Sequence, residues 1–145
     1  ARWYAEPQNL VDLRTLIEAC NLLSVPRVML GRGSNLIVPD DGYNGLVIRM
    51  KGPFWSDVTH RSDDSMIVGA GARLKEICLQ ACKKELRGFE FLEGIPGTLG
   101  GALRMNAGAM GWEIFDLVEW VSFLLPVLLF AQAALIYSAG KGFRE

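Results

Sequence analysis

The residues best suited to chemistry lie in two glycine-rich segments, Gly31-Arg-Gly-Ser-Asn-Leu36 and Gly94-Ile-Pro-Gly-Thr-Leu-Gly-Gly101. The second segment places four glycines and a proline in eight positions, which argues against a helix interior or a central strand. Segments of this kind occur where the main chain approaches another group closely. Backbone N–H groups with no Cβ in the way suit a phosphate. One such turn is a weak signal, but two, each following an apolar run, favour a single extended clamp for a dinucleotide.

The other reactive side chains do not form a recognisable metal or nucleophile site. Cys78 and Cys82 are four residues apart in a predicted helix, and the single histidine, His60, is distant in sequence. A structural zinc site needs four ligands with paired spacing, so no metal site is expected. We interpret the three cysteines as buried free thiols, which favours a reducing cytoplasm. No catalytic residue is identified from the sequence.

Composition and charge restrict the class of protein. Half of the 145 residues are apolar and 21% are charged, which is typical of a globular chain rather than a disordered one. The net charge is −1 and the basic residues are scattered, so no electrostatic footprint for nucleic acid is present. The chain opens without an initiator methionine or a signal-peptide pattern, and we expect a fragment that lacks the N-terminal part of its first lobe.

The pattern over residues 1–51 predicts a small first lobe. Leucines at helical spacing predict a helix over residues 8–23, with Asn9 as its N-cap and Pro26 beyond its end. A turn is expected at residues 39–42. Short apolar runs predict strands at residues 27–30, 36–38 and 46–50. This mixture of helix and strands fits an α/β lobe.

A second lobe is expected over residues 52–125. Residues 65–72 predict a strand that ends in a glycine turn, and residues 74–84 predict an amphipathic helix. An apolar run at residues 89–92 leads into the second glycine segment, and residues 117–125 have high strand propensity.

The last part of the chain differs in kind. Between Trp120 and Lys141 lie twenty consecutive uncharged residues, a length that reaches the threshold for a membrane span. Pro126 interrupts this run and Gln132 adds a polar group. Three interpretations of residues 120–140 remain open: a membrane anchor for a tethered binding module, a buried core segment, and a terminus foreign to the fold.

Five motifs, taken together and in this order, resemble the UDP-N-acetylenolpyruvoylglucosamine reductase (UDP-N-acetylmuramate dehydrogenase) family. The resemblance covers about residues 1–125. The glycine segments alone indicate only the wider class of vanillyl-alcohol-oxidase-like FAD enzymes, whereas Met105-Asn-Ala-Gly-Ala109 favours the reductase. The motifs are Gly31–Val38, Gly42–Ile48, Gly69–Ala72, Gly94–Ala102 and Met105–Ala109.

The resemblance implies an α+β, two-lobed FAD-binding fold of the vanillyl-alcohol-oxidase and peptidoglycan-reductase type, present as a fragment. It also implies FAD as the cofactor. Arg32 would add a charge-assisted bond or remain solvated, and Asn106 would meet the cofactor or cap a turn. The residues expected to bind FAD are Gly31, Arg32, Gly33, Ser34, Asn35, Leu36, Gly69, Gly71, Gly94, Ile95, Pro96, Gly97, Gly100, Gly101, Asn106 and Gly108.

The resemblance further implies a cytoplasmic reductase of peptidoglycan precursor synthesis. Such an enzyme passes hydride from NADPH through FAD to the enolpyruvyl double bond of UDP-N-acetylglucosamine enolpyruvate. The family's catalytic arginine, serine or cysteine, and glutamate have no recognisable counterpart here. Residues 126–145 do not match the family, and its C-terminal substrate domain is absent from this sequence. We therefore expect at most weak FAD binding and little turnover, and keep a flavin oxidase and a non-functional remnant as alternatives.

Overall fold

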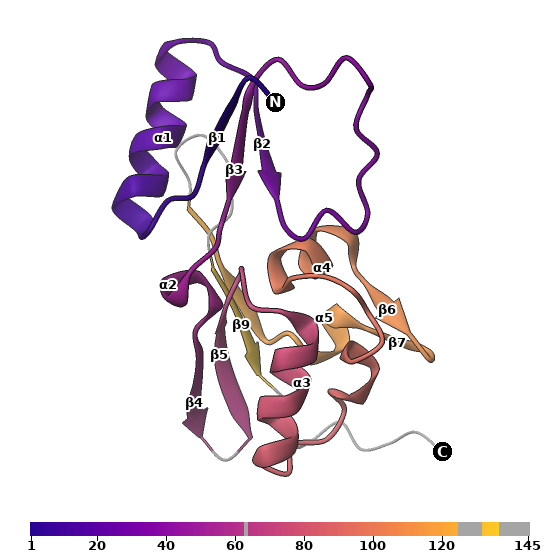
Figure 1. The fold of residues 1–145 in the computed structure, drawn as a ribbon. Helices are drawn as coiled ribbons and strands as arrows, with labels where there is room; N and C mark the ends of the chain where they lie inside the picture. The colour runs from indigo at the N-terminus through magenta and orange to yellow at the C-terminus, as the bar shows by residue number, and fades with distance from the viewer. Residues whose placement is uncertain (63, 125–131, 137–145) are drawn as a thin grey trace.

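A computed structural model describes residues 1–62, 64–124 and 132–136, and its elements form two lobes, each built on its own sheet (Figure 1). Helices and both parallel and antiparallel strands are present, which confirms the predicted α+β class. The predicted division between residues 51 and 52 stays a prediction.

The first lobe is a three-stranded parallel sheet with one covering helix. Strands β1 (Trp3–Ala5) and β2 (Arg27–Leu30) both pair with the central strand β3 (Leu46–Arg49). Helix α1 (Leu10–Leu22) connects β1 to β2 and lies against one face of the sheet (Figure 1). A long loop, residues 31–45, then returns the chain from the edge strand β2 to the centre of the sheet.

Helix α1 begins and ends as its sequence predicts. The Asn9 side chain accepts a hydrogen bond from the backbone N–H of Asp12 at 2.9 Å, which satisfies one of the free donors of the first turn. Leu13, Ile17 and Cys20 are buried against the sheet. The predicted apolar face is therefore confirmed in its middle, while Leu10 at the helix start is partly exposed.

The predicted strand at residues 36–38 is wrong. These residues lie in the long loop outside the sheet, and the side chain of Ile37 is 100% exposed. Strand propensity is realised only where a neighbouring strand supplies hydrogen-bond partners and an apolar surface, and residues 36–38 pair with no strand of the described chain. The predicted turn at 39–42 is present, with the N–H of Gly42 donating to the Pro39 carbonyl at 2.9 Å.

The second lobe is a four-stranded antiparallel sheet in the order β4-β5-β9-β8. Helix α3 carries the predicted apolar face, with Leu74, Ile77 and Ala81 buried against the second lobe's core. The strands are β4 (Val58–Ser62), β5 (Ser65–Gly69), β8 (Trp120–Ser122) and β9 (Gln132–Ile136). The other elements are α3 (Leu74–Lys83), η1 (Glu90–Leu92), α4 (Leu99–Met105), α5 (Ile114–Leu117) and the hairpin β6 (Gly108–Ala109) and β7 (Trp112–Glu113).

Trp55 stabilises the connection between the two lobes. This residue lies in the short helix α2 (Pro53–Ser56) and is completely buried, in the hydrophobic cluster of the first lobe. Its indole Nε1 donates to the Pro7 carbonyl at 2.6 Å. The Trp55 carbonyl accepts from the N–H of Gly71, which follows β5. Through its side chain and its backbone carbonyl, Trp55 thus connects the start of the first lobe to the sheet of the second lobe.

The cysteines only partly follow the prediction of buried thiols. Cys20 is buried, Cys78 is half-buried and Cys82 is exposed, so the prediction is wrong for Cys82. Its position on α3 lies away from the apolar face, which explains the exposure. Burial, together with the carboxylates of Glu93 and Glu90, raises the pKa of the Cys78 thiol. Within the described chain, no group of three His, Cys, Asp or Glu side chains is placed to hold a metal ion.

The apolar run at residues 120–140 contributes two strands. The backbone of β9 pairs with β5 on one side and with β8 on the other, so this segment completes the second sheet. The strand predicted over residues 117–125 is realised only at 120–122, because α5 extends to Leu117. Residues 125–131 and 137–145 lie outside the described chain. Among the described residues, no helix has the length and apolar character that crossing a membrane requires.

Candidate functional site

The carboxyl edge of the first sheet points toward the second lobe. Because β1, β2 and β3 are parallel, the residues that follow them meet at one edge. In open parallel sheets this edge is the usual place for a bound ligand. The residues that follow the three strands are Glu6, Gly31 and Met50. The first glycine segment therefore begins where a ligand site is expected.

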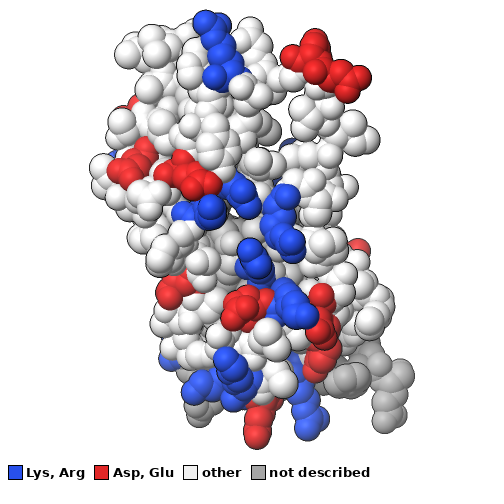
Figure 2. Space-filling view, viewed as in Figure 1, with Lys and Arg blue, Asp and Glu red and all other residues white. Residues whose placement is uncertain are grey.

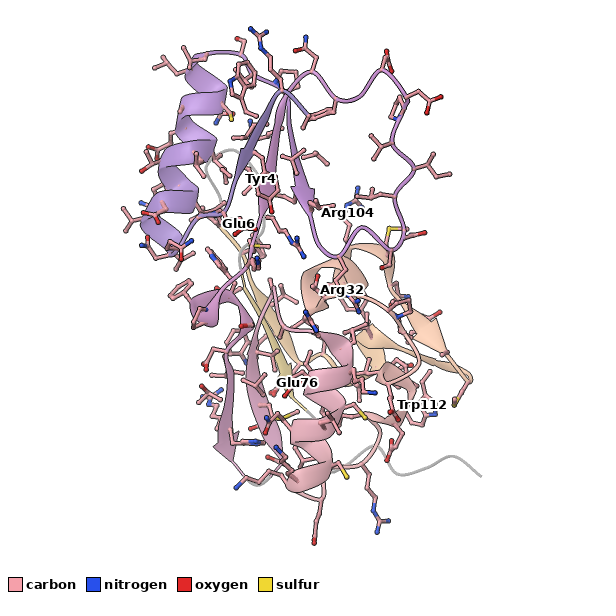
Figure 3. The ribbon with its side chains drawn as sticks, viewed as in Figure 1. Tyr4, Glu6, Arg32, Glu76, Arg104 and Trp112 are labelled. Carbon is pink, nitrogen blue, oxygen red and sulfur yellow. The ribbon has the colours of Figure 1, made fainter. Side chains whose placement is uncertain are left out.

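The two glycine segments meet across the lobes. The Ser34 hydroxyl donates to the Pro96 carbonyl at 2.6 Å, although 62 positions separate them in sequence. A Cβ added to Gly31 would lie 2.8 Å from Thr98 Oγ1, so only glycine allows this approach. Figure 3 shows Arg32, from the loop after β2, and Arg104, from α4, in the region between the two lobes. The fold thus brings together the two segments of the predicted clamp.

The first segment offers free donors. Residues 32–35 are exposed, and none of their N–H groups donates to an acceptor in the described chain. Gly33 has a φ of +76°, a left-handed conformation that glycine adopts without strain. Successive N–H groups in a turn of this kind form a concavity that attracts anions. The segment therefore fits the diphosphate of a dinucleotide, which needs donors that the protein has not already used.

The second segment is docked on the end of β5. The N–H of Gly100 donates to the Ala70 carbonyl at 2.8 Å, and the N–H of Leu99 donates to the Ala72 carbonyl at 2.9 Å. A Cβ on Gly100 would lie 3.2 Å from the side chain and carbonyl oxygen of Ala70. This docking fixes the position of the preceding loop, in which Pro96 and Gly97 face the first lobe. Gly100 therefore positions the loop, whereas Gly94 has open space around it.

Gly69 and Gly71 have a packing role in the structure. A Cβ on Gly69 would press against the Trp55 carbonyl, and a Cβ on Gly71 against the Met50 carbonyl. These glycines allow the end of β5 to approach the connection between the lobes. Their predicted contact with a cofactor stays a prediction, and packing already explains why glycine stands at both positions.

Asn106 and Gly108 lie at the other end of α4. Asn106 ends the helix in a left-handed conformation, with φ of 46°, and its Nδ2 donates to Glu113 Oε2 at 2.5 Å. A Cβ on Gly108 would lie 2.6 Å from the Trp112 carbonyl. At 1.5 Å per residue, the seven residues of α4 place this hairpin roughly 10 Å along the helix from Thr98. The structure groups these two residues with β6 and β7, and it gives Asn106 the cap role.

Four polar residues near the sheet edge were not found from the sequence. The Tyr4 hydroxyl donates to Glu6 Oε1 at 2.6 Å, and Lys51 Nζ lies 3.7 Å from the same oxygen. This bond lowers the pKa of Glu6 and raises the pKa of Tyr4. Arg49, at the end of β3, lies beside the Tyr4 phenol. The one available signal was a basic residue ending an otherwise apolar strand.

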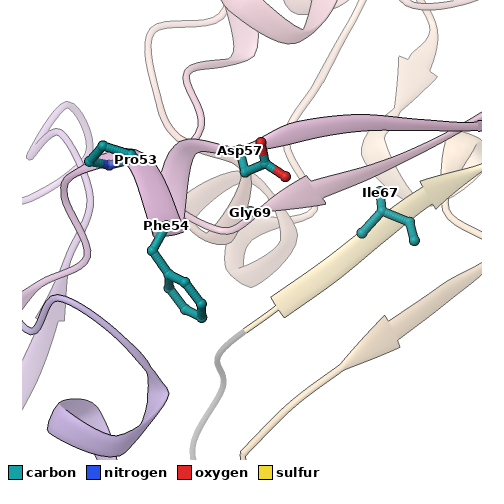
Figure 4. Close-up of a pocket in the computed structure, with 5 residues that line it drawn as sticks. All are labelled: Pro53, Phe54, Asp57, Ile67 and Gly69. Atoms are coloured by element: carbon teal, nitrogen blue, oxygen red, sulfur yellow. The ribbon is translucent and has the colours of Figure 1, made fainter.

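A separate cavity of about 340 Å³ lies beside α2 (Figure 4). It is lined by Pro53, Phe54, Asp57, Ile67 and Gly69. The Asp57 carboxylate already accepts a hydrogen bond from the Thr59 hydroxyl at 2.6 Å. Ligand pockets combine apolar walls with several converging polar groups, which these lining residues do not provide. The contact between the glycine segments remains the better candidate.

Comparison with known proteins identifies the family of the chain. The model of a family described as FAD binding domain matches residues 1–127. UDP-N-acetylenolpyruvoylglucosamine reductase of Oceanobacillus iheyensis is 42% identical over 118 residues, which are 80% of this chain and 37% of the relative. The Lactiplantibacillus plantarum reductase is 40% identical over 129 residues, covering 87% of this chain and 41% of the relative.

A solved structure also matches this chain. UDP-N-acetylenolpyruvylglucosamine reductase from Thermus caldophilus matches with a TM-score of 0.64 and 36% identity, over 81% of this chain and 39% of that one. The two-lobed FAD-binding fold implied by the sequence motifs is thereby confirmed. The chain spans about two fifths of the length of these relatives.

Proposed function

The chain belongs to the FAD binding domain family, and we propose that the contact between its two glycine segments is the cradle for FAD. In this proposal the chain is the flavin-binding part of a UDP-N-acetylenolpyruvoylglucosamine reductase, the activity that its relatives are named for. The single observation that supports it most is the approach of Gly31 and Ser34 to Thr98 and Pro96.

The residues present fit such a cofactor. The free N–H groups of residues 32–35 would donate to its diphosphate, and Arg32 would add a charge-assisted bond. Pro96 stiffens the facing loop before binding, which lowers the entropy cost of ordering it. FAD, when bound, supplies the capacity to accept and pass on a hydride. The contribution of this chain is to hold and orient the cofactor.

The activity of the whole protein is proposed from the names of its relatives. It is an oxidoreductase that uses NADPH to reduce UDP-N-acetylglucosamine enolpyruvate in peptidoglycan precursor synthesis, in the cytoplasm. For the 145-residue chain alone we propose weak FAD binding and little turnover, because the sequence offers no recognisable acid to complete the reduction. All the relatives compared are reductases, so the oxidase alternative is not favoured.

The test is an equilibrium titration of the chain with FAD, followed by flavin fluorescence, with riboflavin and NADPH as comparison ligands. We expect saturable FAD binding and no comparable binding of NADPH. Addition of NADPH and the UDP-sugar to the FAD-loaded chain should give little product. Failure to bind FAD by a chain that is folded by circular dichroism would contradict the proposed function, and efficient reduction of the UDP-sugar would contradict the proposed lack of turnover.

A further inference from the structure

Arg49 stands where the two lobes touch, on the first sheet's carboxyl edge. It ends the central strand β3, and its partner on β2 is Leu30, the residue immediately before Gly31. The next residue, Met50, places its carbonyl against Gly71 of the second lobe. Arg49 is therefore held between the Gly31–Thr98 contact and the Met50–Gly71 contact.

The side chain of Arg49 lies on the face of the sheet opposite α1. Leu46 and Ile48 of β3 are buried in the cluster that α1 covers, and successive strand residues alternate between faces. Arg49 thus shares the other face with Val47 and with Tyr4, which is the register partner of Val47. It is half-buried there, beside the Tyr4 phenol.

Arg49 interacts with the Tyr4 phenol and, at longer range, with the Glu6 carboxylate, but no described carboxylate lies within ion-pair distance of it. The nearby carboxylate, Glu6, bonds to the Tyr4 hydroxyl and lies closer to Lys51. Among the described residues, Arg49 forms no salt bridge. Figure 2 shows several Lys and Arg side chains, with Asp and Glu side chains among them, across the middle of the molecule in the view of Figure 1. A half-buried cation without a close carboxylate keeps N–H groups available, and an anion bound beside it would form charge-assisted hydrogen bonds with them.

We propose that Arg49 is a further cofactor-binding residue, whose guanidinium binds the diphosphate alongside the free N–H groups of residues 32–35. The inference rests on the proposed FAD site and adds to it a fixed positive charge supplied by the central strand. Because the strand is rigid, the charge is in place before the cofactor arrives, which favours binding. An arginine also presents two N–H groups in the fork that suits phosphate oxygens.

The test compares ligands with and without a diphosphate. FAD, riboflavin and inorganic pyrophosphate (as a competitor of FAD) are titrated against the wild type and the Arg49→Gln, Arg49→Lys and Arg14→Gln variants. Arg14 is exposed on α1, which covers the opposite face of the sheet, and serves as the matched control. Loss of a charge-assisted bond predicts that Arg49→Gln weakens FAD and pyrophosphate binding about 10-fold to 100-fold.

Binding of riboflavin, which has no phosphate, should not change in Arg49→Gln. Arg49→Lys should recover part of the FAD affinity, and Arg14→Gln should behave as the wild type. Raising the salt concentration should weaken FAD binding more in the wild type than in Arg49→Gln, because salt screens the removed charge.

The outcomes separate this inference from the proposed function. FAD binding by Arg49→Gln at wild-type strength would overturn the inference and leave the FAD site standing. An equal loss of FAD and riboflavin binding would show a structural role and also overturn it. If Arg49→Gln fails to fold, Arg49→Met, which keeps the apolar stem, takes its place with the same expectations. A folded wild type that binds neither FAD nor pyrophosphate would overturn the proposed function itself, and the inference with it.

Discussion

The hydroxyl of Ser34 donates to the carbonyl of Pro96 at 2.6 Å, and this bond joins the two glycine segments across the lobes. Ser34 lies in the loop that follows β2, while Pro96 lies in the loop that precedes α4. Neither segment alone surrounds a ligand. Their contact creates one surface that carries the free donors of residues 32–35 on one side and a stiff proline loop on the other.

Removing this bond should loosen the contact without unfolding either lobe. Ser34→Ala is expected to lower the free energy of unfolding by about 0.5–1.5 kcal/mol, the usual net value of a hydrogen bond. It should also weaken FAD binding several-fold. Chemical denaturation and an FAD titration measure the two effects.

Ser56→Ala is the matched control for that variant. The Ser56 hydroxyl also donates to a backbone carbonyl, that of Gly52 at 2.9 Å, and is also exposed. Its loss should cost similar stability and leave FAD affinity unchanged. Equal FAD affinity in Ser34→Ala and the wild type would show that the Ser34–Pro96 bond does not shape the cradle.

A side chain at Gly31 should separate the glycine segments. The Cβ of Gly31→Ala would lie 2.8 Å from Thr98 Oγ1, so Thr98 or the loops must shift, and FAD binding should fall about tenfold, which corresponds to about 1.4 kcal/mol. Ser56→Ala, which changes neither glycine segment, should bind FAD as the wild type does. Both variants are compared by FAD titration.

A second substitution should reverse the effect of the first. The double variant Gly31→Ala, Thr98→Ala removes the atom that the new Cβ meets, so FAD affinity should return toward that of Thr98→Ala alone. A loss of FAD binding in Gly31→Ala that Thr98→Ala does not relieve would contradict the steric explanation.

Gly71 should be required for the fold rather than for FAD. A Cβ at this position presses on the Met50 carbonyl and lies 3.0 Å from the Trp55 Cβ. Overpacking of this kind costs about 1–3 kcal/mol, so Gly71→Ala should lower the free energy of unfolding by that amount. Denaturation in the absence of FAD measures it. Unchanged stability in the cofactor-free Gly71→Ala chain, with weakened FAD binding, would instead indicate a direct cofactor contact.

The pKa of Tyr4 and the pKa of Glu6 should depend on each other, because the two side chains share one hydrogen bond. Donation from the Tyr4 hydroxyl lowers the pKa of Glu6, and the bond to the Glu6 carboxylate raises the pKa of Tyr4. Glu6→Gln should therefore shift the pKa of Tyr4 back down toward its ordinary value. Ultraviolet absorption of tyrosinate measures the shift, and Tyr4→Phe identifies which step in the titration belongs to Tyr4.

The same bond sets two pH limits on stability. The contribution of Glu6, whose pKa is lowered by folding, is present above its unfolded pKa and is lost as the pH falls through the folded value. The contribution of Tyr4, whose pKa is raised, is present below its unfolded pKa and is lost as the pH rises through the folded value. A tyrosinate titration that is identical in Glu6→Gln and the wild type would contradict this coupling.

The sequence predicts elements with strong local signals. Asn9 and the leucine spacing locate α1, and the apolar runs locate β2, β3 and β5. It fails where a contact distant in sequence decides the outcome. Residues 36–38 have strand propensity but lie in the loop, because no strand pairs with them in the described chain. The Asn106 side chain bonds to Glu113, seven positions later, a contact that the sequence does not indicate.

The candidate site was predicted as two segments, and their apposition needed the fold. The sequence indicates that Gly31 and Gly100 allow a close backbone approach, but it does not indicate which atom each of them approaches. The motif predicts that Gly69 and Gly71 bind the cofactor, which stays a prediction, and the structure adds a packing role against Trp55 and Met50 that the sequence does not indicate. The sequence signal for Arg49, one basic residue at the end of an apolar strand, is too weak by itself to indicate a site.

The most direct test of the central claim is the visible absorption of the purified chain after incubation with excess FAD and separation from free flavin under conditions of rapid desalting. The cradle formed by the two glycine segments predicts that the wild type and Ser56→Ala retain flavin absorption, at a level reduced by weak binding, while Gly31→Ala loses it. A wild-type chain that is folded but colourless, or a Gly31→Ala chain as yellow as the wild type, would contradict the claim that this contact holds FAD.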